Sequence, residues 1–302
     1  MLRLLFADRL ENWPRYQAPL ATALAEAGIE AEVFLPPAAA ESIDYIIYSP
    51  RGPVQDFTAY TRTKAVLNLW AGVERVVGNP TLTQPLCRMV DEGLERGMVE
   101  WVTGHVLRAH LDIDFFLAHQ DGVWRQEGHV PPLARDRSVV LLGLGALGSA
   151  CAGTLAGIGF AVTGWSRTQK ELPGITCLSS PEGLRAALAR AEILVTILPN
   201  TPETTDLLNA ERLALLPRGA VILNPGRGNL IDDAALLAAL DAGQVGHATL
   251  DVFRTEPLPP EHPYWGHPRV TVTPHIAAET RPASAARVIA ENIRRFEAGE
   301  VP

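Results

Sequence analysis

The stretch VVLLGLGALG, residues 139–148, decides the fold expected for this chain. An apolar run typical of a buried strand leads into Gly143, Gly145 and Gly148, which fit the pattern G-x-G-x-x-G. The first glycine allows a tight turn, the second lets the backbone approach a pyrophosphate, and the third lets helix and strand pack closely. Because the helical sequence SACAGTLAGIG follows at once, the motif predicts a dinucleotide bound at a helix N-terminus. A purely structural glycine turn is the alternative.

Short apolar runs alternate with Ala- and Leu-rich helical stretches on both sides of this motif, as in βα units around parallel sheets. We expect a first series of strands at 2–7, 31–35, 44–49 and 65–70, with helices at 15–27 and 71–77. A second series is expected at 138–143, 161–165, 192–199, 220–226, 247–253 and 269–274, with a clear helix at 232–243. The pattern predicts an α/β protein with two doubly wound parallel-sheet domains.

Two helical stretches suggest how the chain is divided. The stretch 98–120 separates the two series of strands, and the last helix, 281–299, follows the end of the second series. If the last helix folds back onto the first domain, that domain is discontinuous. We therefore expect a substrate-binding domain at 1–97 plus 280–302 and a dinucleotide-binding domain at 98–279, with the helix 98–120 between them.

Composition excludes several classes of protein. The 302 residues are 47% apolar and 20% charged, as in an ordinary globular protein, and the net charge of −8 argues against a nucleic-acid-binding surface. Three widely spaced cysteines cannot all pair, which fits a reducing cytosol. No stretch approaches the roughly 20 apolar residues of a membrane span. We expect a cytoplasmic protein with no nucleic-acid or membrane partner.

The sequence WSRTQK, residues 165–170, indicates which dinucleotide is bound. A glycine-rich turn of this kind usually meets an Asp or Glu about twenty residues later, which binds a ribose 2′-hydroxyl. Here Ser166, Arg167 and Lys170 stand instead. A carboxylate would repel a 2′-phosphate, whereas a hydroxyl and two cations can bind it. The interpretation is NADP(H) in preference to NAD(H), which stays possible; a solvated basic turn is the alternative.

Charged side chains follow three more predicted strands. Arg227 stands in NPGRG, Asp251 and Glu256 in LDVFRTEPL, and His275 in TVTPHIA. Strand ends beside the glycine-rich turn face one crevice in a doubly wound sheet. There a guanidinium can bind a carboxylate and polarise a keto oxygen, while an imidazole oriented by a carboxylate can supply a proton. The three side chains favour hydride transfer to a 2-keto acid, although each taken singly also fits a surface or capping role.

No metal site is expected. His262 and His267 lie near His275, but no cysteine or further histidine stands at ligand spacing.

The segments GLGALG, NPGRG, DVFRTEPLP and TPHIA, in this order and spacing, resemble the D-2-hydroxyacid dehydrogenases. The longer strings WSRTQK, LPNTPETTDLLN and EPLPPEHPYWGHPRVTVTPHIAAETRPA are most similar to the glyoxylate/hydroxypyruvate reductase A branch. The resemblance is densest from about residue 138 to 290 and thinner in the first domain. It implies a Rossmann NAD(P)-binding domain inserted in a flavodoxin-like substrate domain, with the active site in the cleft between them.

The resemblance also implies residue roles. Arg227, Glu256 and His275 would be catalytic, and the substrate would contact Arg227, His275 and the backbone N–H groups of Ala71 and Gly72. The family's homodimer, formed largely through the nucleotide domain and the long helix, would follow too. Asp251 would face the nicotinamide carboxamide. The full cofactor-binding set would be Gly143, Gly145, Ala146, Leu147, Gly148, Ser166, Arg167, Lys170, Leu198, Pro199, Thr204, Pro225, Gly226 and Asp251.

Two departures from the family pattern bear on the substrate. Trp70 stands where the family usually has a glycine before AGVE, and NPGRG replaces NLARG, which places Pro225 and Gly226 beside the nicotinamide. Trp70, Met98, Trp101 and Trp265 are candidates for the pocket wall, with ordinary core or interface packing as the alternative.

These observations together predict NADPH-dependent reduction of glyoxylate, hydroxypyruvate or a similar small 2-oxo acid to the D-2-hydroxy acid, with His275 as the proton donor. One alternative is an NAD-dependent D-lactate- or phosphoglycerate-type dehydrogenase. Another is a dinucleotide-sensing binding protein like the corepressors that share this fold.

Overall fold

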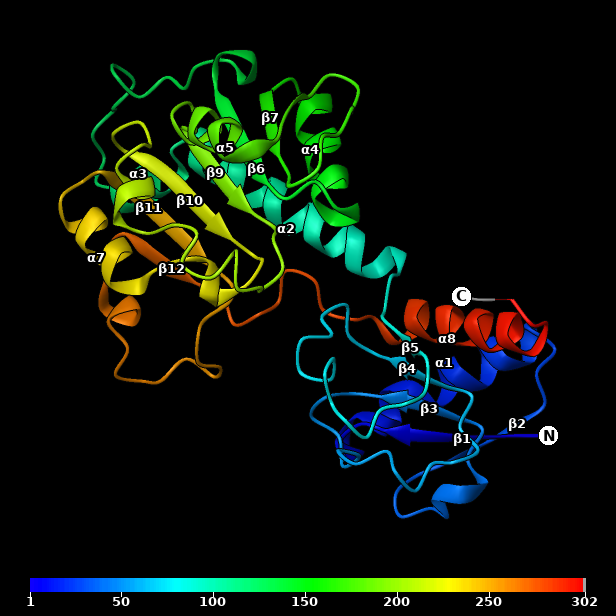
Figure 1. Cartoon of the computed structure of the whole chain (residues 1–302). Coiled ribbons are helices and arrows are strands. Elements are labelled where there is room, and N and C mark those ends of the chain that lie inside the picture. The colour runs from blue at the N-terminus through cyan, green and yellow to red at the C-terminus, as the bar shows by residue number, and fades with distance from the viewer. Residues whose placement is uncertain (301–302) are drawn as a thin grey trace. The chain divides into compact units, whose positions relative to one another are not determined.

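The computed structural model describes residues 1–300 and divides into two compact units (Figure 1). Unit 1 comprises Met1–Leu94 together with the described chain from Glu279 onward, and unit 2 comprises Glu95–Ala278. Within the described residues, the strands form one parallel sheet of five strands and one of seven. The expected α/β class with two doubly wound parallel sheets is therefore confirmed.

Unit 1 has the strand order β2-β1-β3-β4-β5, and every recorded pairing is parallel. This is the flavodoxin-like order expected from the family resemblance. Its strands are β1 (Leu2–Ala7), β2 (Ala31–Phe34), β3 (Tyr45–Tyr48), β4 (Ala65–Asn68) and β5 (Leu86–Cys87). Its helices are α1 (Trp13–Glu26) and α8 (Pro282–Glu297).

The last helix of the described chain returns to unit 1, as expected. Helix α8 packs beside α1, red beside blue in Figure 1. Its buried face includes Ile289 and Ile293. Glu297 accepts hydrogen bonds from the Tyr45 hydroxyl at 2.5 Å and from Lys64 Nζ at 2.6 Å. The C-terminal helix is thus part of the fold of unit 1.

Unit 2 has the order β12-β11-β10-β9-β6-β7-β8, again all parallel. The order reverses between β6 and β9, and such a switch point is where open α/β sheets bind ligands. The strands are β6 (Ser138–Leu142), β7 (Ala161–Trp165), β8 (Thr176–Leu178), β9 (Ile193–Thr196), β10 (Ala220–Asn224), β11 (Val245–Leu250) and β12 (Val270–Val272). The helices are α2 (Glu92–His110, which begins in unit 1), α3 (Ile113–Ala118), α4 (Ala146–Ile158), α5 (Ser180–Leu188), α6 (Ala210–Leu213) and α7 (Asp233–Asp241).

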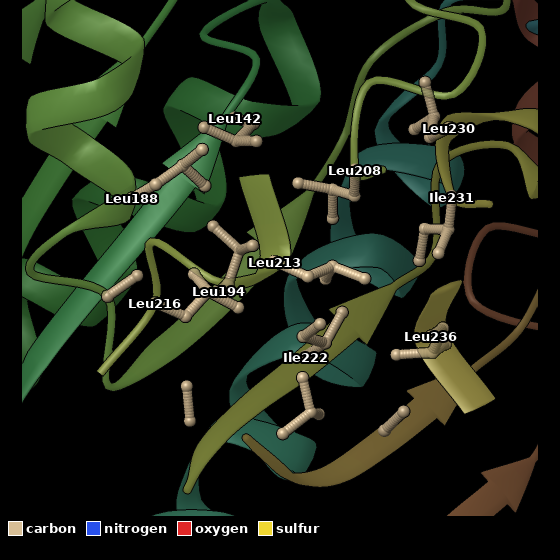
Figure 2. Close-up of a cluster of buried hydrophobic side chains, with 14 of the residues drawn as sticks. Leu142, Leu188, Leu194, Leu208, Leu213, Leu216, Ile222, Leu230, Ile231 and Leu236 are labelled. Atoms are coloured by element: carbon tan, nitrogen blue, oxygen red, sulfur yellow. The ribbon is translucent and has the colours of Figure 1, made fainter. Parts of the chain in front are cut away.

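Alternate residues of the unit 2 strands fill two cores, one on each face of the sheet. Leu142, Leu194 and Ile222 belong to a cluster with Leu188 and Leu236 from the covering helices (Figure 2). Their neighbours in sequence face a second cluster built with residues of α2 and α4. The strands of a sheet that is covered on both faces are continuous apolar runs in the sequence. Such runs are the pattern that predicts these strands.

Two expected helices differ from the structure. The stretch 98–120 is wrong as one helix: α2 begins earlier, at Glu92, and ends at His110, and α3 is separate. The chain breaks because Asp112 adopts the left-handed conformation, with φ of 53°. The helix at 71–77 is also wrong, because the N–H groups of Val76 and Val77 both bond to the Val73 carbonyl and close a single turn.

The strands β5 and β8 were missed, since each is only two or three residues long. Among residues 1–300, no helix combines the length and the apolar content that crossing a membrane requires.

Candidate active site

The glycine-rich turn opens helix α4 at the switch point of unit 2. Gly143 has a φ of +108°, and a Cβ on Gly148 would lie 1.9 Å from the Gly143 carbonyl oxygen, so neither position admits a side chain. At Gly145, the N-cap of α4, a Cβ would meet nothing within 4 Å, and no side chain caps the helix. The tight turn and the open, uncapped helix N-terminus fit a dinucleotide pyrophosphate. Ala146 and Leu147 form the first turn of α4.

The WSRTQK turn follows β7, the strand next to β6. Arg167 and Lys170 are exposed, and no carboxylate stands in the turn, which fits a 2′-phosphate rather than a free ribose hydroxyl. Ser166 is buried, and its hydroxyl donates to the Thr168 carbonyl at 2.7 Å. A hydroxyl has one proton to donate, so in this conformation Ser166 shapes the turn. That Ser166, Arg167 and Lys170 bind a phosphate stays a prediction.

The loop after β9 carries three more predicted cofactor residues. Leu198 and Pro199 leave the sheet at its carboxyl edge, and the Thr204 hydroxyl donates to the Pro199 carbonyl at 2.6 Å. Thr204 therefore holds this loop together. A dinucleotide bound at the switch point would lie next to the loop.

Arg227 is held by a buried amide that sequence reasoning missed. Asn224 ends β10, and its Oδ1 accepts from the Thr196 hydroxyl at 2.7 Å and from the Gly226 N–H at 3.1 Å. Its Nδ2 donates to the Arg227 carbonyl at 3.0 Å. Pro225 and Gly226 are buried between these anchors. The sequence signal that could have identified Asn224 is a polar residue at the end of an otherwise apolar strand.

The segment after Arg227 lies directly against the segment that carries Glu256. A Cβ on Gly228 would lie 2.0 Å from the carbonyl carbon of Phe253, so only glycine allows this approach. The segments that follow β10 and β11, which carry Arg227 and Glu256, therefore lie side by side within unit 2.

His275 and Glu256 form the pair expected from the sequence. The Nδ1 atom of His275 lies 2.8 Å from Glu256 Oε2, and Glu256 Oε1 accepts from the Phe253 N–H at 3.0 Å. The His275 side chain is 49% exposed and that of Glu256 17%, so the outer edge of the imidazole stays accessible. His275 has a φ of 56°, a strained conformation for a residue with a Cβ, and such strain is often found at functional sites.

Asp251 supports the turn that carries His275. It is fully buried, and Oδ1 accepts from the Thr273 hydroxyl at 2.6 Å and the Ile276 N–H at 2.9 Å. Oδ2 accepts from the Ala277 N–H at 2.9 Å. These contacts make Asp251 a positioning residue; its role toward the nicotinamide carboxamide stays a prediction.

A charged network lies behind the Glu256 loop. Arg254 pairs closely with Asp206, donates to the Ile231 carbonyl at 2.6 Å and lies 3.5 Å from Asp233. The Tyr264 hydroxyl donates to Asp233 at 2.9 Å, and burial together with this carboxylate raises the pKa of Tyr264. The network ties the loop that carries Glu256 to the residues that follow Arg227.

In unit 1, the loop after β4 contains Ala71 and Gly72. The buried Asn68 donates to the Trp70 carbonyl at 2.8 Å and the Gly72 carbonyl at 3.0 Å. Within residues 1–300, the N–H groups of Ala71 and Gly72 donate no recorded hydrogen bond, which fits the carboxylate-binding role implied by the resemblance.

Two candidates for the pocket wall have core contacts. Met98 and Trp101 pack in the α2 side of the unit 2 core together with Ala277, and Trp101 Nε1 donates to the Thr273 hydroxyl at 3.3 Å. Core packing is therefore observed for both, and a role in the pocket wall stays a prediction. In the described part of the chain, no group of three or more histidine, cysteine, aspartate or glutamate side chains is arranged to hold a metal ion.

Comparison with known proteins agrees with this geometry. Residues 105–277 match the model of the D-isomer specific 2-hydroxyacid dehydrogenase, NAD binding domain. The chain belongs to this dehydrogenase family. The family consists of NAD(P)-dependent oxidoreductases, so the chain is an enzyme of this class.

Solved structures of other dehydrogenases of the family resemble the whole chain. One from Xanthobacter autotrophicus Py2, in complex with NADPH and MES, is 40% identical over 99% of this chain and 95% of that one, with a TM-score of 0.89. An NADPH-dependent glyoxylate/hydroxypyruvate reductase from Sinorhizobium meliloti, with NADP and sulfate, is 33% identical over 100% and 96%, with a TM-score of 0.87.

A probable 2-hydroxyacid dehydrogenase from Rhizobium etli CFN 42, in complex with NADP, HEPES and L(+)-tartaric acid, is 30% identical over 99% and 96%, with a TM-score of 0.87. All three are similar to this dehydrogenase along nearly its full length.

Proposed function

We propose that this dehydrogenase reduces glyoxylate, hydroxypyruvate or a similar small 2-oxo acid to the D-2-hydroxy acid with NADPH. The observation that carries the proposal is the 2.8 Å contact between His275 and Glu256, next to the segment that carries Arg227. The Sinorhizobium meliloti relative is an NADPH-dependent glyoxylate/hydroxypyruvate reductase, and the likeness supports the same substrate class here.

The proposed cofactor is NADP(H). Arg167 and Lys170 would bind the 2′-phosphate, and the open N-terminus of α4 would hold the pyrophosphate. Three relatives crystallised with NADP or NADPH support this choice over NAD(H). When bound, the cofactor supplies a hydride to the carbonyl carbon of the substrate.

The proton comes from His275 in this proposal. Because a carboxylate only accepts hydrogen bonds, Nδ1 of His275 donates to Glu256, and Nε2 is left to donate to the substrate oxygen. As the carbonyl oxygen gains negative charge, His275 donates its proton to that oxygen.

Arg227 would bind the substrate's carboxylate through two parallel hydrogen bonds and polarise the keto oxygen. Within unit 1, the N–H groups of Ala71 and Gly72 would donate to a substrate carboxylate. Asn224 and Asp251 hold the backbone of the turns that carry Arg227 and His275, which fixes where each catalytic side chain begins.

An assay of NADPH oxidation with glyoxylate and with hydroxypyruvate tests the proposal. We expect turnover with both acids and a higher kcat/KM for NADPH than for NADH. Replacing Arg167 and Lys170 by alanine should raise the KM for NADPH about tenfold or more, since charge-assisted contacts to the phosphate are lost. Turnover with NADH alone would support an NAD-dependent dehydrogenase, and cofactor binding without turnover would support a dinucleotide-sensing protein.

We further propose that the dehydrogenase is a homodimer. Exposed apolar side chains are concentrated in α3 and the segments on either side of it, where Leu117 is 69% and Trp124 90% exposed. The other exposed apolar residues of this part of the chain are Leu111, Ile113, Phe116, Val123, Val130 and Leu133. Exposed apolar side chains in such number mark an interaction site, and we propose that a second copy of the chain covers them.

Light scattering tests the dimer and should give twice the chain mass. The double variant Leu117→Asp with Trp124→Asp should be a monomer, and a monomeric parent protein would refute the dimer.

A further inference from the structure

Arg254 lies in the same short turn as Glu256, the carboxylate that is bonded to His275. The Phe253 N–H donates to Glu256 Oε1 at 3.0 Å and closes this turn, so Arg254 lies between its two ends. Glu256 Oε2 lies 2.8 Å from His275 Nδ1. A displacement of the turn would therefore move the carboxylate that orients the imidazole.

The guanidinium of this turn is anchored on two segments that backbone hydrogen bonds hold together. The loop after β9 lies beside the segment after β10, because the Asp206 N–H bonds to the Asn229 carbonyl at 2.8 Å and the Leu208 N–H bonds to the Leu230 carbonyl at 2.9 Å. Leu208 and Ile231 also form a parallel bridge, and Figure 2 shows both side chains. The two segments thus form one base within unit 2.

The guanidinium contacts this base at three points. Its Nη2 donates to the Ile231 carbonyl at 2.6 Å and pairs closely with Asp206, and its Nε lies 3.5 Å from Asp233 Oδ2. Asp233 accepts a further hydrogen bond from the Tyr264 hydroxyl at 2.9 Å. One side chain therefore joins the turn of Glu256 to both segments of the base.

Asp206 adopts an unfavourable backbone conformation where it meets Arg254. Its φ is 52°, in the left-handed region, which Asp adopts more readily than most residues but which glycine adopts without strain. The Asp206 side chain is 46% exposed and that of Arg254 33%, so their ion pair adds little to the stability of the fold. A strained residue whose contact contributes little stability indicates a role in the nearby site.

We propose that Arg254 is a positioning residue for proton transfer. Its guanidinium, paired with Asp206, holds the turn of Glu256 in the place where the carboxylate orients His275. The same contact ties this turn to the loop that carries Thr204, one of the predicted cofactor-binding residues. The inference rests on the proposed function, because that function makes His275 the proton donor.

Arg254→Met keeps the long side chain but removes its charge and its donors. We expect kcat for glyoxylate reduction to fall about tenfold to hundredfold, since a small displacement of a catalytic group can cost that much. The urea midpoint of unfolding should be nearly unchanged and the KM for NADPH should stay within about twofold, because the lost contact is partly exposed and backbone hydrogen bonds keep the loop of Asp206 in place.

Two further variants frame this result. Arg254→Lys keeps the charge and should restore part of kcat, although an ammonium cannot reproduce the fork of donors. Arg185→Met is the matched control, since it removes another exposed guanidinium of unit 2, paired with Glu211 at 2.9 Å. It should change neither kcat nor the KM for NADPH.

Asp206→Gly separates positioning from folding. Glycine relieves the backbone strain, which offsets its greater freedom in the unfolded chain, so the urea midpoint should not fall while kcat should. Adding Asp206→Gly to Arg254→Met should lower kcat no further, because both changes remove the same contact. The solvent deuterium isotope effect on kcat should rise in each variant, since proton transfer from a displaced His275 becomes slower.

Hydrogen–deuterium exchange of the Phe253 amide measures the turn without turnover. This amide should exchange faster in Arg254→Met than in the parent protein, because its bond to Glu256 is weakened, and Arg185→Met should have no effect.

Unchanged exchange or unchanged kcat in Arg254→Met would overturn the positioning role, and so would parallel losses of kcat, NADPH affinity and stability. A parent protein that does not reduce 2-oxo acids, but whose Phe253 amide exchanges faster in Arg254→Met, would overturn the proposed function instead. The two failures are therefore distinguishable.

Discussion

The two edges of the seven-stranded sheet carry histidines in different surroundings. At the carboxyl edge, His275 is half exposed and bonded to Glu256. At the amino edge, His105, His110 and His247 line a hollow together with residues that open β9, β10 and β11. Burial lowers the pKa of all three, with a smaller effect from nearby arginines on His105 and His110.

The difference shows what makes a histidine useful for proton transfer. The imidazole of His275 has both a carboxylate bonded to Nδ1, which orients the ring, and access to solvent or substrate. Burial penalises the charged form of the three histidines of the amino edge, so their pKa is lowered. The predictions below test this contrast, from the largest expected effect to the smallest.

Replacing His275 by asparagine should have the largest effect. Asparagine tolerates the left-handed backbone of this position but cannot donate a proton as a general acid. We expect kcat to fall about a hundredfold to ten-thousandfold while NADPH binding is kept. Single-turnover kinetics and cofactor fluorescence measure the two quantities. An equal loss of NADPH binding would point to a structural role for His275.

Replacing Arg227 by lysine should have the next largest effect on catalysis. An ammonium group keeps the charge but cannot form two parallel hydrogen bonds to a carboxylate, so kcat/KM for the 2-oxo acid should fall about tenfold to hundredfold. Arg218→Lys, on an exposed arginine that bonds to the Ala242 carbonyl, is the matched control. Steady-state kinetics measure this value. If kcat/KM is unchanged in both variants, Arg227 does not bind the substrate.

Replacing Asp251 by asparagine should affect folding as well as activity. An amide cannot accept all three hydrogen bonds that the carboxylate receives, so a buried donor loses its partner at a cost of about 1–3 kcal/mol. Urea unfolding should show this loss, together with a lower kcat from a displaced His275. Asp241→Asn, on an exposed carboxylate, should change neither quantity. Full activity in Asp251→Asn would show that the turn of His275 needs no such support.

Lowering the pH should reduce the free energy of unfolding through the three buried histidines at the amino edge of the sheet. This should be the smallest of the predicted effects. The pKa of these histidines is lowered in the fold, whereas in the unfolded chain they take up protons below a pKa of about 6.5. The unfolded state then binds more protons, so the free energy of unfolding falls as the pH drops below this value. Urea midpoints between pH 7.5 and 5.5 measure the slope.

His110→Phe keeps the ring that packs on Phe160 and should reduce the slope. His119→Phe, on an exposed histidine, is the control and should not reduce it. An unchanged slope in His110→Phe would contradict the assignment to buried histidines.

Much of the site could be predicted from the sequence because its parts are local. The glycines of GLGALG, the missing acid in WSRTQK, and the strand-end positions of Arg227, Glu256 and His275 are all read from short segments. The pairing of His275 with Glu256 needed the family resemblance in addition, since 18 residues separate them in the chain and their contact depends on the fold.

The sequence by itself determined the α/β class, the position of the dinucleotide motif and the types of side chain at the strand ends, because periodicity and turn chemistry act over a few residues. Only the tertiary structure decided that Asn224 and Asp251 hold the catalytic turns, that Ser166 bonds within its own turn and that Arg254 pairs with Asp206. The reason is physical. A buried polar group needs partners, and those partners come from strands that are distant in the chain and adjacent only in the folded sheet.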